Sequence, residues 1–330
     1  MTFSIIVPVY NRPAEIAELL ESLCRQEGNI PFEVIIIEDG STLPCRQTAE
    51  KFAPALPIIY HAKANTGRSH SRNTGMRLAK GDYFIFFDSD CIIPPRYFAR
   101  LEACLAAGGA PCFGGPDAAH PSFSDLQKAI SYAMTAPLTT GGIRGGKHTV
   151  ETFQPRTFNM GFSRKVYEKV GGFNNMLGED IDLSIRIARA GFRIACYPEL
   201  FVYHKRRISL FQFYKQVRNF GTARVNLALI HKNTLKPVHA LPAIALLAGT
   251  AIAVTAFFAP LILLLPAAAL AVLFTDALRK TKRIKTAILS LFAAVIQITA
   301  YGWGFLRACV LKIILRRGME SNEKLSRIYK

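Results

Sequence analysis

The stretch YFIFFDSDCII, residues Tyr83 to Ile93, ends a run of apolar and aromatic side chains with two aspartates spaced one residue apart. A near-continuous run of Phe and Ile is typical of a strand buried on both faces of a sheet. Asp88 and Asp90 are predicted to lie past the end of that strand, where a turn can bring both carboxylates toward one point. Such a pair suits a hard divalent cation, Mg²⁺ or Mn²⁺. The alternative is an ordinary strand-end turn capped by Asp.

Three similar runs precede this stretch, and longer amphipathic segments separate them. The runs are FSIIVPV (3–9), FEVIIIE (32–38) and PIIYH (57–61), and helices are predicted between them at about 13–26, 46–53 and 69–80. The first hundred residues therefore predict an α/β fold, with β-α repeats around a mostly parallel sheet. In such a sheet ligands bind beyond the carboxyl ends of the strands, near a switch in strand order.

The middle of the chain is less regular but contains one well-marked helix. It is predicted at 179–190 in GEDIDLSIRIARAG, where acids fill the first turn, Arg186 and Arg189 lie in the last two turns, and Gly191 follows. The other expected elements are a strand at CFGG (112–115), a helix at 123–136, a flexible loop at TTGGIRGGK (139–147) and an extended segment at FRIACYPELFVYH (192–204).

A long uncharged segment marks the C-terminal half. No charged residue occurs from Ala240 to Thr275, which is too long for one membrane crossing of about 20 residues and fits two short ones turned near Pro260. A pair of buried core helices is the alternative. Basic residues flank the run on both sides, so the positive-inside rule predicts a helical hairpin with both ends in the cytoplasm. They are Lys205, Arg206, Arg207, Lys215, Arg218, Arg224, Lys232 and Lys236 before the run, and Arg279, Lys280, Lys282, Arg283 and Lys285 after it.

Two more segments belong with this hairpin. ISLFQFYKQVRNFGTARVNLALI (208–230) alternates aromatic and basic residues at helical spacing and predicts an amphipathic helix on the membrane surface. TAILSLFAAVIQITAYGWGFL (286–306) is long enough to span, but a basic tail follows it, and Gln297, Gly302 and Gly304 are expected to interrupt it. A spanning segment and an in-plane or re-entrant segment both remain open.

Charge and cysteine content exclude several classes of protein. The net charge of +18 would fit nucleic acid, but no nucleic-acid motif accompanies the basic residues, so membrane lipids are the expected partner. The seven cysteines have no CxxC pair or regular spacing, which argues against a zinc site or a disulfide framework and for reduced thiols in the cytoplasm. The N-terminal MTFSIIVPVYNR has no basic segment before its apolar run and predicts a strand, not a signal peptide.

We therefore expect four parts along the chain. They are a catalytic domain (1–205), an amphipathic interfacial segment (206–238), a transmembrane hairpin (239–278), and a basic loop with the third apolar segment and basic tail (279–330).

Polar residues follow two further parts of the predicted sheet. Glu38 and Asp39 end the second strand before a Gly turn, where an acid can accept from a base N–H or a ribose hydroxyl; a plain D-G turn is the alternative. In NTGRSHSRNTG, Asn65, Gly67 and Arg68 are expected in a loop and Arg72 and Asn73 on the first turns of a helix that Ser69 or Ser71 can cap. Arg72 can reach a diphosphate there, unless this is only a solvated helix start.

Four stretches in this order resemble the family 2 glycosyltransferases, which have the GT-A fold and use nucleotide-activated sugars. They are SIIVPVYNR, IEDGS, NTGRSHSRNTGMRLAKGDYFIFFDSDCIIPP and GGFNNMLGEDIDLSIRIARAGFRI, and the resemblance covers roughly residues 3 to 220. It implies a Rossmann-like, mostly parallel sheet with flanking helices, here followed by C-terminal membrane helices.

The resemblance also implies roles for residues of this chain. Asp180 falls at the catalytic base, with Glu179 beside it, and crowding by acids can tune a carboxylate toward accepting a proton; the alternative is that these acids only complement the helix dipole. Asp88 and Asp90 form the metal-binding D-x-D motif, to which His204 in FVYHKRR is added. The donor-binding residues implied are Pro8, Tyr10, Asp39, Asn65, Arg72 and Asp88.

One motif of processive members is broken in this chain. Where their Q-x-x-R-W motif stands, QVRNF offers Gln216 but Asn219 and Phe220 in place of Arg-Trp; Arg218 is the candidate substitute as a phosphate contact. Together with the few membrane segments, this favours addition of a single sugar.

The sequence therefore predicts an inverting, metal-dependent glycosyltransferase in the cytoplasmic membrane, with its catalytic domain facing the cytoplasm. Its expected donor is a nucleotide diphosphate sugar and its expected acceptor a lipid-linked saccharide in cell-surface glycan synthesis. The nearest alternative loads a sugar onto polyprenyl phosphate. A sugar-nucleotide nucleotidyltransferase would need a Gly-rich loop after the first strand, which PVYNRPAEI lacks, and a non-enzymatic membrane scaffold is the last alternative.

Overall fold

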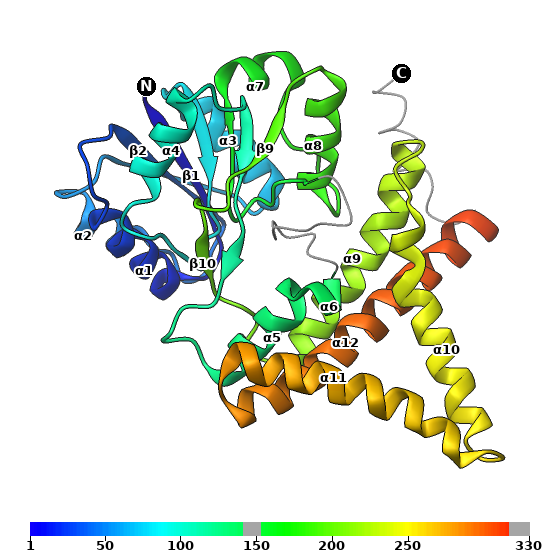
Figure 1. Cartoon of the computed structure of the whole chain (residues 1–330). Helices are drawn as coiled ribbons and strands as arrows, with labels where there is room; N and C mark the ends of the chain where they lie inside the picture. Colours follow the sequence, from blue (N-terminus) through cyan, green and yellow to red (C-terminus); the bar gives the residue numbers. More distant parts are fainter. Residues whose placement is uncertain (141–152, 317–330) are drawn as a thin grey trace. The chain divides into compact units, whose positions relative to one another are not determined.

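The computed structural model describes residues 1–140 and 153–316, and their contacts divide the chain into two compact units (Figure 1). The first unit runs to His120 and resumes after the gap up to Lys205; the second holds the segment that begins at Pro121 and the chain from Arg206. Most of the predicted loop at 139–147 and the basic tail beyond 316 lie outside the described residues.

A seven-stranded sheet forms the centre of the first unit. All neighbouring strands are parallel except β8, which runs antiparallel to both β4 and β6. The predicted mostly parallel sheet is therefore confirmed. In spatial order the strands are β3 (Ile58–Lys63), β2 (Phe32–Asp39), β1 (Phe3–Val9), β4 (Tyr83–Phe86), β8 (Met160–Ser163), β6 (Cys112–Gly114) and β9 (Ile194–Cys196).

Helices cover both faces of this sheet, which explains the continuous apolar runs of its strands. Along β1, Ile5 and Val7 belong to one hydrophobic cluster while Ile6 belongs to the other. The first cluster is completed by α1 (Pro13–Cys24), α2 (Arg46–Phe52) and α4 (Tyr97–Ala106), and the second by α3 (Arg68–Leu78), α7 (Arg164–Val170) and α8 (Glu179–Arg189).

A second, three-stranded sheet lies in the same unit. It consists of β5 (Cys91–Ile92), β10 (Val202–His204) and β7 (Asp117–Ala118), with β10 in the middle. Its register pairs His204 with Cys91 and Val202 with Asp117. Residues more than 100 positions apart in the chain are thereby brought next to the turn that follows β4.

The start of α3 differs from the expectation that Ser69 or Ser71 caps it. The helix begins at Arg68, and Gly67, with φ of 93°, is the N-cap without any side-chain cap. The backbone N–H of Gly67 donates instead to Asp39 Oδ2 at 2.9 Å, while the Ser71 hydroxyl donates to the carbonyl of Gly67 at 3.1 Å. Asp39 thus fixes the loop residues just before the helix, and no side chain caps the first helical turn.

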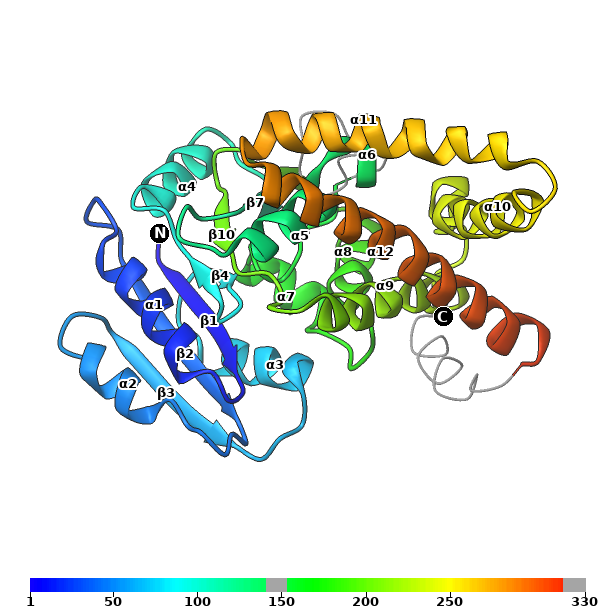
Figure 2. The ribbon, with the colours of Figure 1, turned by 90° about the horizontal axis from the view of Figure 1, so that it is seen from below.

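The second unit is helical over its described residues. Its long apolar segments include three that could cross a membrane by length and composition: Pro237–Thr255, Pro260–Thr281 and Ile284–Ile314. Figure 2 shows α10 and α11 joined at a turn, with α12 following. The helices are α5 (Asp125–Thr135), α6 (Pro137–Thr140), α9 (Leu210–Ile230), α10 (Leu241–Thr255), α11 (Leu264–Thr281) and α12 (Ile284–Ala308), with short turns at Pro237–Ala240, Pro260–Leu263 and Cys309–Ile314.

The third apolar segment forms one continuous helix in spite of the polar and small residues in its apolar run. Gln297, Gly302 and Gly304 all lie within the continuous helix α12. A Cβ on Gly304 would lie 2.0 Å from the carbonyl oxygen of Arg218 on α9, and one on Gly302 2.6 Å from that of Pro242 on α10. These glycines therefore let neighbouring helix backbones approach α12, and packing compensates for their low helix propensity.

Candidate active site

The strand order reverses at β1, whose neighbours are β2 and β4. In a parallel sheet, such a switch point opens a crevice beyond the carboxyl ends of the strands. Arg12 follows β1, Asp39 ends β2, and Asp88 and Asp90 follow β4. These side chains are carried to the same edge of the sheet.

Asp39 is buried at this edge and accepts from three donors. Thr66 N–H donates to its Oδ1 at 3.0 Å, Gly67 N–H donates to its Oδ2 at 2.9 Å, and the Lys63 ammonium also donates to Oδ1. Burial alone would raise the pKa of Asp39, but the hydrogen bonds from Lys63, Thr66 and Gly67 outweigh it and hold that pKa below its ordinary value. Asp39 is therefore an ionised acceptor that also fixes the start of α3.

The neighbouring Glu38 stabilises the turn that follows β2. Its carboxylate accepts from Cys45 N–H at 2.7 Å and from the Tyr60 hydroxyl at 3.2 Å. Gly40 then has φ of 70°, and a Cβ there would lie 2.5 Å from the backbone nitrogen of Asn65. Glycine is needed at this point because the loop that carries Asn65 packs directly on it.

Arg72 joins two of the sequence-predicted site residues. Its Nη2 donates to Asp88 Oδ1 at 2.9 Å and its Nη1 donates to Glu179 Oε1 at 3.0 Å. The Arg72 side chain is only 2% exposed, and a guanidinium buried to this degree needs carboxylate partners to offset its desolvation. The bridge ties the turn after β4 to the first turn of α8.

Glu179 receives a second guanidinium as well. Arg68 Nε lies 2.7 Å from Glu179 Oε1, and Arg68 Nη2 donates to Oε2 at 2.9 Å. Both carboxylate oxygens of Glu179 are therefore committed to arginines, whereas the Arg68 side chain is 57% exposed. A catalytic role for Glu179 stays a prediction, and these contacts favour its neighbour as the proton acceptor.

Asp180 is held more loosely in the same helical turn. Its Oδ1 accepts from Ile181 N–H at 2.8 Å, and its Oδ2 lies 3.7 Å from Arg156 Nη1. Asp182, the third acid, is buried and forms an ion pair with Arg186 at 3.0 Å. The three acids of α8 therefore have different surroundings, and the role of Asp180 as the base stays a prediction.

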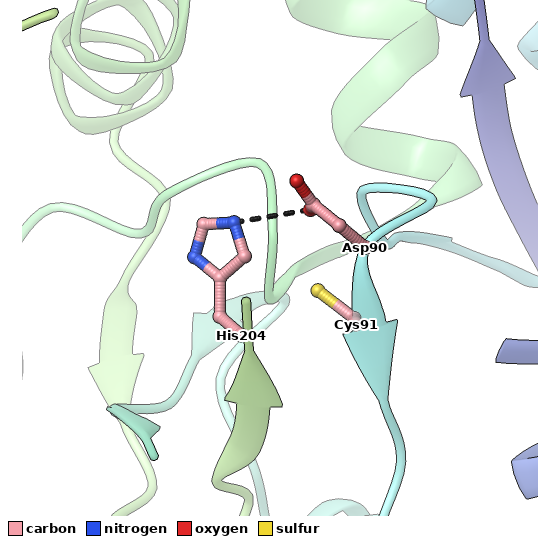
Figure 3. Close-up of side chains that lie close together, drawn as sticks. All are labelled: Asp90, Cys91 and His204. Atoms are coloured by element: carbon pink, nitrogen blue, oxygen red, sulfur yellow. Dashed lines mark ion pairs between the residues drawn. The ribbon is translucent and has the colours of Figure 1, made fainter. Parts of the chain in front are cut away.

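Asp90 and His204 meet in the small sheet, and Cys91 lies beside them (Figure 3). Potential ligand atoms of these three residues lie within 4.8 Å of one another, and His204 Nε2 is 3.2 Å from Asp90 Oδ1. On the other side of Asp90, Arg12 Nη1 donates to Oδ2 at 2.6 Å. Asp90 thus faces an imidazole with one oxygen and a guanidinium with the other.

The donor set fits a hard divalent cation. Neighbouring ligands on an octahedral ion with bonds near 2.1 Å lie about 3 Å apart, which agrees with the Asp90 to His204 spacing. Cys91 is the poorer ligand, because burial and then the carboxylates of Asp90 and Asp88 raise the pKa of its thiol. Its Sγ donates instead to the Phe158 carbonyl at 3.6 Å. Asp88, one third exposed, belongs to the same turn.

The imidazole of His204 is fixed from two directions. The Phe158 ring stacks on it with centroids 4.7 Å apart, and Asp117 Oδ2 lies 3.6 Å from its Nδ1. A carboxylate near Nδ1 favours the tautomer whose Nε2 is free to bind a cation.

The remaining predicted residues are placed as follows. Pro8 lies on β1 beyond the last residue that pairs with β4, so its missing N–H removes no bond on that side. Tyr10 follows β1 and is half exposed. Arg218 lies on α9 in the second unit, so its role as a phosphate contact stays a prediction.

Four residues of the site were not anticipated as such from the sequence. Arg156 and Asp117 occur in stretches without a periodic or spaced signal, Arg12 ends the motif stretch SIIVPVYNR but received no role, and Arg68 was expected only in a loop. Each acts through a contact with a residue at least 24 positions away. These residue pairs become visible only when the fold brings the distant segments together.

Family comparisons agree with this architecture. The model described as glycosyl transferase family 2 matches residues 4–171, about half of the chain. The chain belongs to this family. A second model, glycosyl transferase family 21, matches residues 145–318.

Curated relatives of the family align over different lengths. An uncharacterized glycosyltransferase from Haemophilus influenzae is 41% identical over 28% of this chain and 31% of its own length. The succinoglycan biosynthesis protein ExoA from Rhizobium meliloti is 25% identical over 69% of this chain and 70% of its own. The hyaluronan synthase of Pasteurella multocida is 28% identical over 61% of this chain but only 24% of its own. The matched regions thus span less than a third of the first and third relatives.

A solved structure supports the fold. The mannosyltransferase PcManGT from Pyrobaculum calidifontis, determined with GDP-Man and Mn²⁺, aligns with a TM-score of 0.58 at 20% identity. The alignment covers 96% of this chain and 87% of the other. The GT-A fold predicted from the sequence is thereby confirmed.

Proposed function

We propose that this protein transfers a single sugar from a nucleotide diphosphate sugar to a lipid-linked saccharide, with inversion at the anomeric carbon. The observation that carries the proposal is the buried Arg72 bridge, which joins Asp88 of the D-x-D turn to Glu179, the residue before Asp180. This bridge supports the proposal because it connects the turn after β4 to the first turn of α8.

The donor side is supported by the sheet edge. Asp39 is an ionised acceptor at the end of β2, where a nucleoside N–H or hydroxyl can donate to it. Asp90 and His204, with Asp88 beside them, would hold Mg²⁺ or Mn²⁺, which when bound would neutralise charge on the leaving diphosphate. Family membership and the GDP-Man and Mn²⁺ in the structure of PcManGT support the same assignment.

The proposed step is a direct displacement. The Asp180 carboxylate takes the proton of the acceptor hydroxyl while that oxygen forms a bond to the sugar C1. The bond between C1 and the phosphate oxygen breaks, and the nucleoside diphosphate leaves with the bonding electrons. One displacement inverts C1. Arg156 Nη1, 3.7 Å from Asp180 Oδ2, helps to orient the carboxylate before the proton is taken.

The second unit supports the proposed lipid-linked acceptor and cytoplasmic membrane location. Its three apolar segments are long enough to cross a membrane, and basic residues flank the first two. The names of two relatives, a succinoglycan biosynthesis protein and a hyaluronan synthase, fit a role in polysaccharide synthesis.

A panel experiment tests the proposed function. Membranes containing the protein are incubated with labelled nucleotide sugars and Mn²⁺ or Mg²⁺, and lipid-linked product is extracted. We expect label in the lipid fraction for one donor and loss of that label with a chelator. The proposal would be contradicted if, for every donor in the panel, the sugar were transferred only to water or not transferred at all.

Two variants of α8 form a matched pair for the mechanism. Asp180→Asn is expected to lower kcat by about 10²- to 10⁴-fold while nucleotide-sugar binding persists. Asp182→Asn, two residues further along the same helix, is expected to keep turnover in the folded fraction because the contacts described for Asp182 are with Arg186 and Asn174. Near-normal turnover of Asp180→Asn would instead favour an anionic acceptor such as polyprenyl phosphate, which needs no base.

A further inference from the structure

Arg12 lies where the donor and the cation of the proposed reaction would meet. It is the N-cap residue of α1, directly beyond β1 at the switch point of the sheet. Its Nη1 donates to Asp90 Oδ2 at 2.6 Å, and its side chain is one third exposed. The short distance is that of a charge-assisted hydrogen bond, so the guanidinium occupies one of the two oxygens of Asp90.

The other oxygen of Asp90 is the one that faces His204, 3.2 Å from Nε2. A divalent cation between these two atoms would share the Asp90 carboxylate with Arg12. Two positive groups on one carboxylate repel each other, and a partly buried site screens this repulsion weakly. The pair of contacts therefore disfavours a cation that arrives without compensating negative charge.

A diphosphate supplies that negative charge. Its oxygens can bind the cation and at the same time accept from a guanidinium, whose planar fork matches phosphate geometry. Arg12, one third exposed and beside the cation site, has the exposure needed to turn from Asp90 to such a group.

We propose that Arg12 is an electrostatic latch that makes cation binding depend on the nucleotide diphosphate. Without nucleotide, Arg12 neutralises Asp90 and keeps the affinity for the cation low. With nucleotide, Arg12 pairs with the diphosphate and releases Asp90 to the cation. This inference rests on the proposed function for the cation site. It adds that the site binds the cation tightly only together with the donor.

The test measures Mn²⁺ binding rather than turnover. The full-length protein in detergent is titrated with Mn²⁺, and free Mn²⁺ is followed by electron paramagnetic resonance, alone and with saturating UDP or GDP. The variants are Arg12→Gln, Arg12→Lys and Arg25→Gln. Arg25 is the matched control, because it caps the other end of α1 and pairs only with Glu21 on the same helix among the contacts the structure describes.

We expect nucleotide to tighten Mn²⁺ binding strongly in the wild type, within the roughly 5- to 150-fold range of coupled sites. Arg12→Gln should bind Mn²⁺ alone about tenfold tighter and lose most of the gain from nucleotide. Arg12→Lys, which keeps the charge, should retain weak binding of Mn²⁺ alone, and Arg25→Gln should match the wild type.

Other outcomes separate the latch from the proposed function. If Arg12→Gln weakens Mn²⁺ binding or leaves the gain from nucleotide unchanged, Arg12 only positions Asp90, and the latch is overturned while the cation site stands. If the wild type binds no Mn²⁺ even with nucleotide, both the latch and the metal assignment fall. Circular dichroism of each variant shows whether a change in affinity reflects loss of the fold.

Discussion

At the scale of single residues, this site is a set of carboxylates that differ in the cationic side chains they contact. Glu179 is held by Arg68 and Arg72, whereas Asp90 is shared between Arg12 and His204. Arg72 was predicted to approach the phosphates, but both of its terminal nitrogens are used within the protein. Its contacts favour a positioning role, and a direct phosphate contact stays a prediction.

Asp39 allows a prediction of how stability depends on pH. Because its pKa is lowered in the folded protein, ionised Asp39 stabilises the fold above the ordinary Asp value near 3.9, and this stabilisation is lost as the pH falls through the folded pKa. Asp39→Asn should cost about 1–2 kcal/mol of unfolding free energy near neutral pH. The difference from the wild type should shrink below pH ~4. Denaturant unfolding in detergent at several pH values measures it.

The control for this variant is Glu50→Gln on α2, an exposed residue whose nearest cation is Arg46 at 3.9 Å. It should leave the unfolding free energy unchanged across the same pH range. If Asp39→Asn lowers the unfolding free energy by the same amount at low pH, the shape of the Asp39 side chain, not its charge, explains its contribution.

Short motifs made part of this site predictable. Asp88, Asp90 and Asp180 each follow a local signal, either a strand end or a helix start, so the sequence placed them at the sheet edge or on the first turn of α8. Their partners Arg12 and Arg156 could not be found this way. Ion pairs between distant segments depend on the sheet order and on β10 returning beside β5, which no local pattern encodes.

At the scale of elements, the second unit depends on glycines where two of its helices cross. Gly304 of α12 and Gly221 of α9 lie where a Cβ would come within 2.0 Å and 2.2 Å of a carbonyl oxygen on the other helix. The first four long strands of the first unit and the helices α1, α2, α3 and α8 were predicted because each has its own local apolar pattern, whereas α4, α7, β5, β7 and β8 were not. A glycine at a helix crossing looks like a break until the second helix is known.

These contacts give a matched pair of substitutions. Gly304→Ala should destabilise the second unit by about 1–3 kcal/mol, because the new methyl group would force α9 and α12 apart. Gly249→Ala on α10, where nothing lies within 4 Å of the added carbon, should leave stability unchanged or raise it slightly. Thermal unfolding in detergent compares them, and equal melting temperatures would argue against close packing of α9 on α12.

At the scale of the whole molecule, the membrane segments differ in how much protein covers them. Of the most apolar window of each candidate span, 11% is buried for Pro237–Thr255 and 6% for Pro260–Thr281, but 33% for Ile284–Ile314. One face of α12 packs on α5 and α9 through small residues such as Ala293 and Ala300. Its exposed apolar side chains recur at helical spacing on the other face: Ile284, Ile288, Phe292, Val295 and Trp303.

This arrangement favours one of the two alternatives left open for the third segment. Helix α9, which α12 contacts along its length, carries Lys215, Arg218 and Arg224 and is not among the candidate spans found in the described residues. A helix packed lengthwise on such a partner is costly to place across the hydrocarbon core. We therefore predict that α12 lies in the plane of the cytoplasmic surface with its apolar stripe toward lipid, while α10 and α11 cross as a hairpin.

Cysteine labelling tests this topology. Phe258→Cys at the tip of the hairpin, where the side chain is 87% exposed, should react with a membrane-impermeant maleimide in right-side-out vesicles. Lys282→Cys, after the hairpin, and Leu315→Cys, beyond α12, should react only in inside-out vesicles. The wild type, whose native cysteines all lie outside the hairpin, gives the background. Labelling of Leu315→Cys from outside would show that α12 spans the membrane, because a third crossing carries the chain that follows it to the opposite side from Lys282.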